Sequence, residues 1–395
     1  MVRTLLTLAI LTTIVKRTLA EGREFIVQWT RHHNVNDHVK LLQFALPPPG
    51  SNPWGDPLNI QWELVDRRNA ATSRYPSDFS LVRFQPMPND VCPRVSLLEE
   101  AMEKLRSSDH IRGVFQQEVI RRTLSTVPSR VGGTEHPSEF PGGDNTGRAP
   151  QGRGTVRGSS SWRYVRPGLE GEGLWAEGYT GQGVRVAVFD TGLEERHQHF
   201  GNVVERINWT DEGALEDSMD HGTHVAGVVA SNDPACPGFA PDVDLHIFRV
   251  FSDKQVSYTS WFLDAFNYAI FSGIHVINLS IGGPDFRDQP FMDKVREVSA
   301  NKIILVSAVG NDGPIYGTHN NPADQPDTIG VGALSDSIDH DQVAMFQSRG
   351  MTTWELPRLG LTPSPPKTSQ QFIDRPKPCH PPKQADYTSL FFRTH

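Results

Sequence analysis

Three polar residues in this sequence follow strand-like apolar runs or open a helix-like one, and their types suit acid–base catalysis. Asp190 ends the run Val184–Phe189, Asn311 follows the run Ile303–Gly310, and His221 begins a helix-like stretch. A histidine supported by a carboxylate can act as a general base, and an amide can donate a hydrogen bond to a developing oxyanion. Together, the three side chains predict a site for acyl transfer.

Asp190 alone is ambiguous. It belongs to an Asp-Thr-Gly sequence, which occurs in aspartic proteases and also in plain turns at strand ends. An aspartic protease needs a second Asp-Thr-Gly or Asp-Ser-Gly with which to share a proton, and the sequence contains no other. This excludes an aspartic protease and leaves a strand-end turn as the alternative to a catalytic carboxylate.

His221 opens the sequence His-Gly-Thr-His-Val-Ala-Gly, in which the apolar positions share one face of a helix. At a helix N-terminus the dipole disfavours the imidazolium and keeps the ring available as a base near neutral pH. A structural histidine is one alternative, and zinc binding by His221 and His224 is another. No Glu follows as in the zinc-protease helix motif and no third ligand has suggestive spacing, so we assign no metal ligand.

Two further segments are candidate sites. The residues Ser280, Ile281, Gly282 and Gly283 follow a strand-like run, and their backbone groups could pair with an extended substrate. Asn208 begins an Asn-Trp-Thr sequence, which is a glycosylation acceptor in a secreted chain. For the serine–glycine segment the alternative is an ordinary strand-to-loop turn.

Taken jointly, these motifs resemble the subtilases. Val-Ala-Val-Phe-Asp-Thr-Gly, His-Gly-Thr-His-Val-Ala-Gly, Val-Ile-Asn-Leu-Ser-Ile-Gly-Gly and Ser-Ala-Val-Gly-Asn-Asp-Gly-Pro occur in the order that this family requires. The resemblance implies a serine-type endopeptidase in which Asp190 orients and supports His221, His221 is the general base and Asn311 stabilises the oxyanion. It also implies protein or peptide substrates, and Ca²⁺ as a candidate ion.

Within the subtilases, residues 24–357 resemble the subtilisin/kexin-type enzymes of the secretory pathway. That resemblance implies cleavage of membrane-bound transcription factor precursors, with Arg four residues before the cut and Leu just before it. Arg121 and Leu124 fit this pattern, which makes Arg121-Arg122-Thr123-Leu124 the candidate self-processing site and the preceding unit a propeptide that binds its own enzyme. The alternative is an incidental arginine pair in a linker.

The nucleophile is the main departure from the family pattern. Subtilases of this type continue to Gly-Thr-Ser-x-Ala-Ser-Pro, whose first serine attacks the substrate, whereas this sequence becomes low in complexity after Pro357. The later serines Ser364, Ser369 and Ser389 lack the preceding Gly-Thr. Loss of the nucleophile costs on the order of 10⁶ in rate in subtilisin, so we expect the chain as written to be inactive.

Three hypotheses about function follow. The chain is a truncated form of a serine endopeptidase, or a catalytically dead binding or inhibitory modulator of the full-length protease, or, with the weakest support, a zinc-dependent hydrolase that uses its histidines. A nucleophilic serine in a longer product would favour the first. Stable secretion with peptide binding would favour the second, and bound metal the third.

Composition divides the chain into five expected parts: a signal peptide at 1–20, a propeptide-like α+β unit at 21–124, a Gly/Pro/Ser/Arg-rich linker at 125–165, a partial subtilisin-like catalytic domain at 166–357 and a low-complexity divergent tail at 358–395. In the fourth part, near-continuous apolar strands alternate with helices. This pattern predicts an α/β fold with a parallel sheet covered by helices on both faces. We expect the sheet to be incomplete because the family pattern stops early.

Charge and cysteine content narrow the function classes. The net charge of -8, with 37% hydrophobic and 21% charged residues, favours a soluble globular chain and argues against nucleic-acid binding. No segment after the signal reaches the ~18 apolar residues of a membrane span, so we expect the lumen of the secretory pathway or secretion, without the Golgi membrane anchor of the family. Cys92, Cys236 and Cys379 predict no disulfide framework and are expected to be packed or free thiols.

Overall fold

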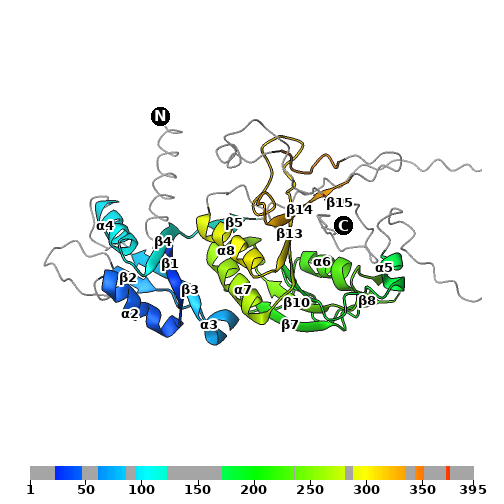
Figure 1. Cartoon of the computed structure of the whole chain (residues 1–395), viewed down its shortest axis with the longest axis horizontal. Coiled ribbons are helices and arrows are strands. Elements are labelled where there is room, and N and C mark those ends of the chain that lie inside the picture. Colours follow the sequence, from blue (N-terminus) through cyan, green and yellow to red (C-terminus); the bar gives the residue numbers. More distant parts are fainter. Residues whose placement is uncertain are drawn as a thin grey trace, which may run out of the picture.

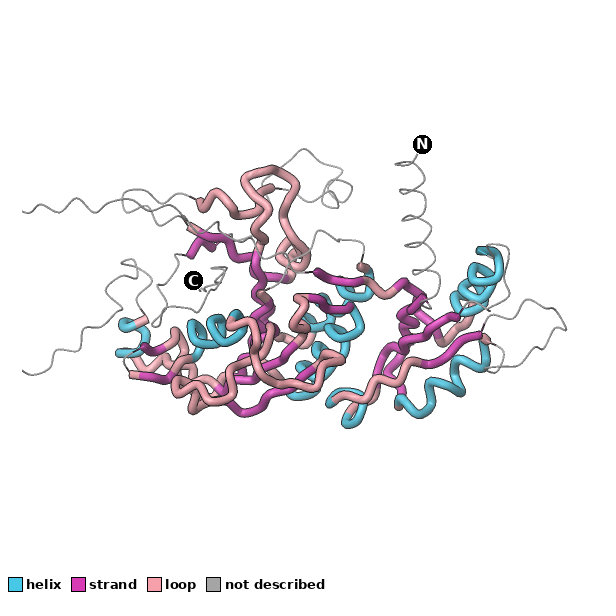
Figure 2. The backbone as a smooth tube through the Cα atoms, turned by 180° about the vertical axis from the view of Figure 1, so that it is seen from behind, coloured by secondary structure: helices cyan, strands magenta, loops and turns pink. Residues whose placement is uncertain are grey.

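A computed structural model describes residues 23–46, 61–85, 95–121, 171–234, 236–280, 288–334, 343–350 and 371–373. The expected signal peptide, the expected linker, Leu124 and the segment Ile281–Gly283 lie outside these residues. The described part of the chain forms an N-terminal unit and a larger unit beside it (Figure 1). Figure 2 shows their two sheets separately.

The N-terminal unit is a four-stranded antiparallel sheet in the order β2-β3-β1-β4, with two helices on one face. Strand β1 alternates between the two faces: Phe25, Val27 and Trp29 pack against the helices, while Ile26 faces the other way. The elements are β1 (Arg23–His33), α2 (Val35–Ala45), β2 (Gln61–Leu64), α3 (Ala70–Arg74), β3 (Ser77–Gln85), α4 (Val95–Arg106), β4 (Ile111–Gln116) and β5 (Val119–Arg121). This agrees with the predicted α+β unit.

The larger unit is built on a seven-stranded sheet in the order β15-β14-β13-β12-β6-β10-β7, in which every neighbouring pair is parallel. The strands are β6 (Arg185–Asp190), β7 (Val203–Asn208), β10 (Asp244–Arg249), β12 (Val276–Leu279), β13 (Ile304–Ala308), β14 (Thr328–Ala333) and β15 (Gln371–Ile373). Its helices are α5 (Glu172–Ala176), α6 (His221–Ala230), α7 (Thr259–Ser272) and α8 (Gln289–Ala300). The predicted α/β fold with a parallel sheet is confirmed.

Helices cover both faces of this sheet, as the side-chain alternation in β6 shows. Val186 and Val188 pack with α6, whereas Ala187 and Phe189 pack with α7 and α8. All four side chains are buried, as expected for a strand in the middle of a parallel sheet. The sheet is therefore a rigid support whose carboxyl edge can hold side chains in place.

Two features differ from the sequence-based expectations. Within the expected low-complexity tail, β15 pairs with β14, because an edge strand offers backbone donors and acceptors that any extended segment can meet. Cys236, which begins the short strand β9 (Cys236–Pro237) opposite β8 (Asn232–Asp233), is disulfide-bonded rather than a free thiol. The prediction for Cys236 was therefore wrong.

The N-terminal unit docks on α7 and α8 through an apolar centre and buried polar pairs. Phe79 and Leu81 on β3 pack against Leu263 of α7, and all three are buried. Asp264 of α7 forms an ion pair with Arg67 and accepts a hydrogen bond from Asn69 at 2.7 Å. This contact keeps the two units in one arrangement.

Candidate active site

The centre of the candidate site is a hydrogen-bonded pair between Asp190 and His221. The Nδ1 atom of His221 lies 2.8 Å from Oδ1 and 2.9 Å from Oδ2 of Asp190. Asp190 is the last residue of β6 and His221 the first of α6, and both are buried. A carboxylate on Nδ1 holds the ring so that Nε2 can accept a proton, which is the geometry that a general base requires.

Asp217 fastens the two elements that carry this pair. Its Oδ1 accepts hydrogen bonds from Thr191 Oγ1 at 2.7 Å and Met219 N at 3.0 Å. Its Oδ2 accepts from Thr223 N and Thr223 Oγ1, each at 2.8 Å. Thr191 follows Asp190 directly and Thr223 lies in the first turn of α6, so one buried carboxylate ties the aspartate turn to the histidine helix.

The turn after β6 and the first turn of α6 approach each other so closely that only glycine fits between them. A Cβ on Gly222 would lie 2.3 Å from the carbonyl oxygen of Gly192, a contact that a side chain cannot make. Gly192 has a φ of 114°, which other residues rarely adopt. These two glycines therefore let α6 begin against the end of β6, which brings His221 to Asp190.

Ser280 and Asn311 come from neighbouring strands at the same edge of the sheet. In the register, Leu279 of β12 stands opposite Phe189 of β6 and Ser307 of β13. The next residue along β12, Ser280, is therefore level with Asp190, and Asn311 lies three residues after the end of β13. All three leave the carboxyl edge, where sites of parallel sheets gather.

The side chain of Ser280 is buried and its Oγ donates to Asn278 Oδ1 at 3.1 Å. This leaves backbone groups as the means by which the segment would contact a substrate. The other three residues of that segment, Ile281, Gly282 and Gly283, lie outside the described residues. Its role in substrate binding stays a prediction.

Arg121 ends β5, which pairs with β11 (Val256–Tyr258) of the larger unit, just before α7. The pairing is antiparallel, with Arg121 opposite Val256 and Val119 opposite Tyr258. It continues in the hydrogen bond from Thr259 N to the carbonyl of Glu118 at 3.2 Å. The end of the N-terminal unit thus lies as an extended strand on the larger unit, three residues before the candidate cut after Leu124.

Asn208 closes a small loop after β7. Its Nδ2 donates to the carbonyl oxygens of Glu212 and, at 2.9 Å, of Ala214, and its Oδ1 accepts from Thr210 N at 2.8 Å. A glycan on Nδ2 would replace at least one of these bonds. Glycosylation of Asn208 stays a prediction.

The histidine pair does not gain a third metal ligand from the part of the chain that the structure describes. His224 Nε2 is buried without a hydrogen-bond partner. Burial, and to a lesser degree the neighbouring His221, lowers the pKa of His224 to about 4, so its ring is neutral at neutral pH. His224 is thus a buried, neutral histidine beside the Asp–His pair.

Several features in and around the candidate site were not predicted from the sequence. Asp217 lies in an acidic loop with no motif of its own, although its position four residues before His221 was a usable signal. The pairing of β5 with β11 joins segments 135 residues apart, as the register of Arg121 and Val256 shows (256 − 121). Helix α8 was also missed, although Asp288 caps its N-terminus and Pro290 stands in its first turn.

Fold and site together define an α/β protein with a buried Asp–His pair at the carboxyl edge of a parallel sheet. The model of the subtilase family matches residues 181–384, which is 204 of 395 residues and so just over half of the chain. The chain therefore belongs to the subtilase family, whose members are serine endopeptidases. Residues 21–118 match the N-terminal domain of the membrane-bound site-1 protease family.

Relatives of known name support this assignment. The chain is 50% identical over 309 residues to "Membrane-bound transcription factor site-1 protease" of Cricetulus griseus, which covers 75% of this chain and 28% of that protein. It is 48% identical over 312 residues to the protein of the same name from Homo sapiens, with the same two shares. It is also 32% identical over 188 residues to "Subtilisin E" of Bacillus subtilis (strain 168), covering 46% of this chain and 48% of that enzyme.

The matched region thus spans little more than a quarter of the length of the site-1 protease relatives. In the described residues, no helix combines the length and apolar character needed to cross a membrane.

Proposed function

We propose that Asp190 and His221 are the acid–base part of a secretory-pathway endopeptidase site that acts on membrane-bound transcription factor precursors at Arg-x-x-Leu sequences. The observation that carries the acid–base role is the buried Nδ1–carboxylate contact of 2.8 Å at the carboxyl edge of the sheet, whereas the substrate class is proposed from the similarity to site-1 protease. His221 would take the proton of the attacking serine and return it to the leaving amine, and Asp190 would stabilise the imidazolium formed between these steps. Asn311 would donate to the oxyanion.

In this family the nucleophilic serine belongs to a Gly-Thr-Ser sequence, and no Gly-Thr-Ser occurs among these 395 residues. We therefore propose that these residues alone do not hydrolyse peptide bonds. The test uses a fluorogenic peptide ending in Arg-Arg-Thr-Leu and a serine-reactive fluorophosphonate. We expect neither turnover nor labelling with the printed chain, and both with a product of the same gene that continues to Gly-Thr-Ser. Turnover by the printed chain that is lost in His221→Ala would refute this.

We propose Arg121 and Leu124 as recognition residues for self-processing. The antiparallel pairing of β5 with β11 supports this, because it presents the chain in the extended form in which proteases bind substrates. In an active product, Arg121→Glu and Leu124→Glu should each leave the N-terminal unit attached. Arg112→Glu is a matched control, since Arg112 is an exposed arginine of the same unit that pairs with Asp293 and lies outside the candidate cleavage sequence. Processing that continues unchanged in both test variants would place the cut elsewhere.

A second candidate function is inhibition of the full-length protease by this chain. The observation that favours it is again the strand pairing, since a segment that pairs with β11 could pair in the same way with the corresponding strand of a partner enzyme. Adding the purified chain to hamster site-1 protease should then slow peptide hydrolysis. An equal rate with and without the chain would remove this candidate.

A further inference from the structure

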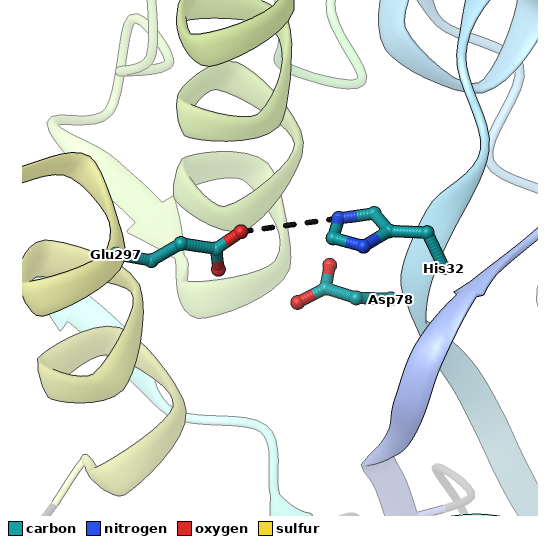
Figure 3. A group of neighbouring side chains, drawn as sticks. All are labelled: His32, Asp78 and Glu297. Atoms are coloured by element: carbon teal, nitrogen blue, oxygen red, sulfur yellow. Dashed lines mark ion pairs between the residues drawn. The ribbon is translucent and has the colours of Figure 1, made fainter. Parts of the chain in front are cut away.

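We propose that His32, Asp78 and Glu297 form a zinc-binding site that joins the N-terminal unit to the larger unit. One ligand atom from each of these residues lies within 4.8 Å of one from both others. Figure 3 shows the His32 ring and the Asp78 carboxylate, both from the N-terminal unit, turned toward Glu297 of α8. Imidazole nitrogen and carboxylate oxygen are among the ligands that Zn²⁺ uses in proteins.

The distances suit a bridging ion better than a direct contact. His32 Nε2 lies 3.9 Å from Glu297 Oε1, which is too long for a hydrogen bond. Two zinc–ligand bonds of ~2.0–2.2 Å span up to about 4.4 Å end to end, so an ion between these atoms can reach both. Tetrahedral angles would require the two atoms to lie somewhat closer, which calls for a small shift of the His32 ring from its edge-on contact with Phe271.

The two carboxylates are already held in place, as ligands of a metal usually are. Lys294 Nζ donates to Asp78 Oδ2 at 2.6 Å and to Glu297 Oε2 at 2.7 Å. Asn267 Nδ2 donates to Asp78 Oδ1 at 2.9 Å. These bonds orient both carboxylates and leave Glu297 Oε1 turned toward His32.

The local charge also favours a cation. Asp78 and Glu297 are two acidic groups, and the buried Lys294 is one basic group in contact with both. The two carboxylates thus outnumber the one ammonium group, and a divalent ion would enter from the exposed side of His32.

The site connects parts of the chain that are far apart. His32 lies on β1 and Asp78 on β3, while Glu297 lies on α8. An ion bound by all three stabilises the docked arrangement, because it binds only when the two units are together. Zinc would thus act as a clamp on the N-terminal unit, independently of any catalytic activity of the chain.

The test measures zinc binding by the purified 395-residue chain after treatment with a chelator. Isothermal titration with Zn²⁺ gives affinity and stoichiometry, and Co²⁺ absorption reports the geometry. We expect one ion per chain and a zinc-induced rise in melting temperature. His32→Ala and Glu297→Gln should each weaken binding by about 100-fold or more, because even residues around the ligands contribute roughly 10–100-fold.

His110→Ala is the matched control, because His110 is an exposed histidine of the same unit outside the cluster. Its binding and melting temperature in zinc should equal those of the parent chain. Far-UV circular dichroism confirms that the variants fold. Absence of binding at micromolar zinc, or equal binding in His32→Ala and the parent, would overturn the proposal and leave His32 and Glu297 as a simple ion pair. Binding lost only in His221→Ala would place the ion at the Asp–His pair instead.

Discussion

Replacing Asp217 by alanine should loosen the contact between Asp190 and His221 without changing either residue. The change removes an acceptor of four hydrogen bonds, from Thr191 Oγ1, Met219 N, Thr223 N and Thr223 Oγ1. Hydrogen bonds to a charged group contribute about 1.5–3 kcal/mol each, but water can enter the space that the side chain leaves. We therefore expect a loss of about 3–5 kcal/mol in the free energy of unfolding, toward the upper end for one substitution.

Two measurements check this expectation. Urea unfolding gives the free energy, and proton NMR of the folded chain follows the low-field resonance of the His221 Nδ1 proton, which reports its contact with Asp190. We expect that resonance to shift or broaden in Asp217→Ala. Asp253→Ala is the control, because the Asp253 side chain is 56% exposed and its loss should cost no more than about 1 kcal/mol. A loss below about 1 kcal/mol in Asp217→Ala, or an unchanged His221 resonance, would refute the role given to Asp217.

Three further predictions concern packing and pH. Gly222→Ala should lower the free energy of unfolding in urea by about 1–3 kcal/mol, because its Cβ would lie 2.3 Å from Gly192 O. Gly227→Ala in the same helix, where a Cβ would have no neighbour closer than 3.8 Å, should be neutral or stabilising. Equal effects of the two changes would contradict the close approach of α6 to Gly192. Burial lowers the pKa of His38 from 6.5 to about 4, and the nearby Arg67 and His33 add to this effect. Between these two pH values the unfolded chain binds a proton that the folded chain does not, so the free energy of unfolding should fall as the pH drops from about 6.5 toward 4. His38→Gln should flatten this dependence in thermal melts from pH 7 to pH 4.5, and an unchanged slope would show that His38 is not its source. Arg67→Ala should cost about 3–5 kcal/mol at pH 8 because it leaves Asp264 buried without its ion pair. Burial already raises the pKa of Asp264, so protonation of the folded state should make the loss smaller at pH 5, and a loss that is the same at both pH values would contradict this.

The class of fold could be predicted from the sequence, and so could the two side chains that meet in the candidate site. The apolar runs of β6, β10, β12 and β13 lie in a sheet covered on both faces, and such strands keep a pattern that is visible without coordinates. Asp190 and His221 were found because each stands next to an apolar run and a glycine. Such features depend only on residues that are adjacent in the chain, so the sequence alone reveals them.

Other features depend on which distant segments meet, and only the tertiary structure decided them. Asp217 has no distinctive neighbours, and its role follows from lying between Thr191 and Thr223. The contact of β5 with β11 rests on backbone groups, which every residue carries and no composition reveals. Likewise, His32, Asp78 and Glu297 are ordinary surface residue types in sequence, and they become a candidate metal site only because docking of the N-terminal unit on α8 places their charges together.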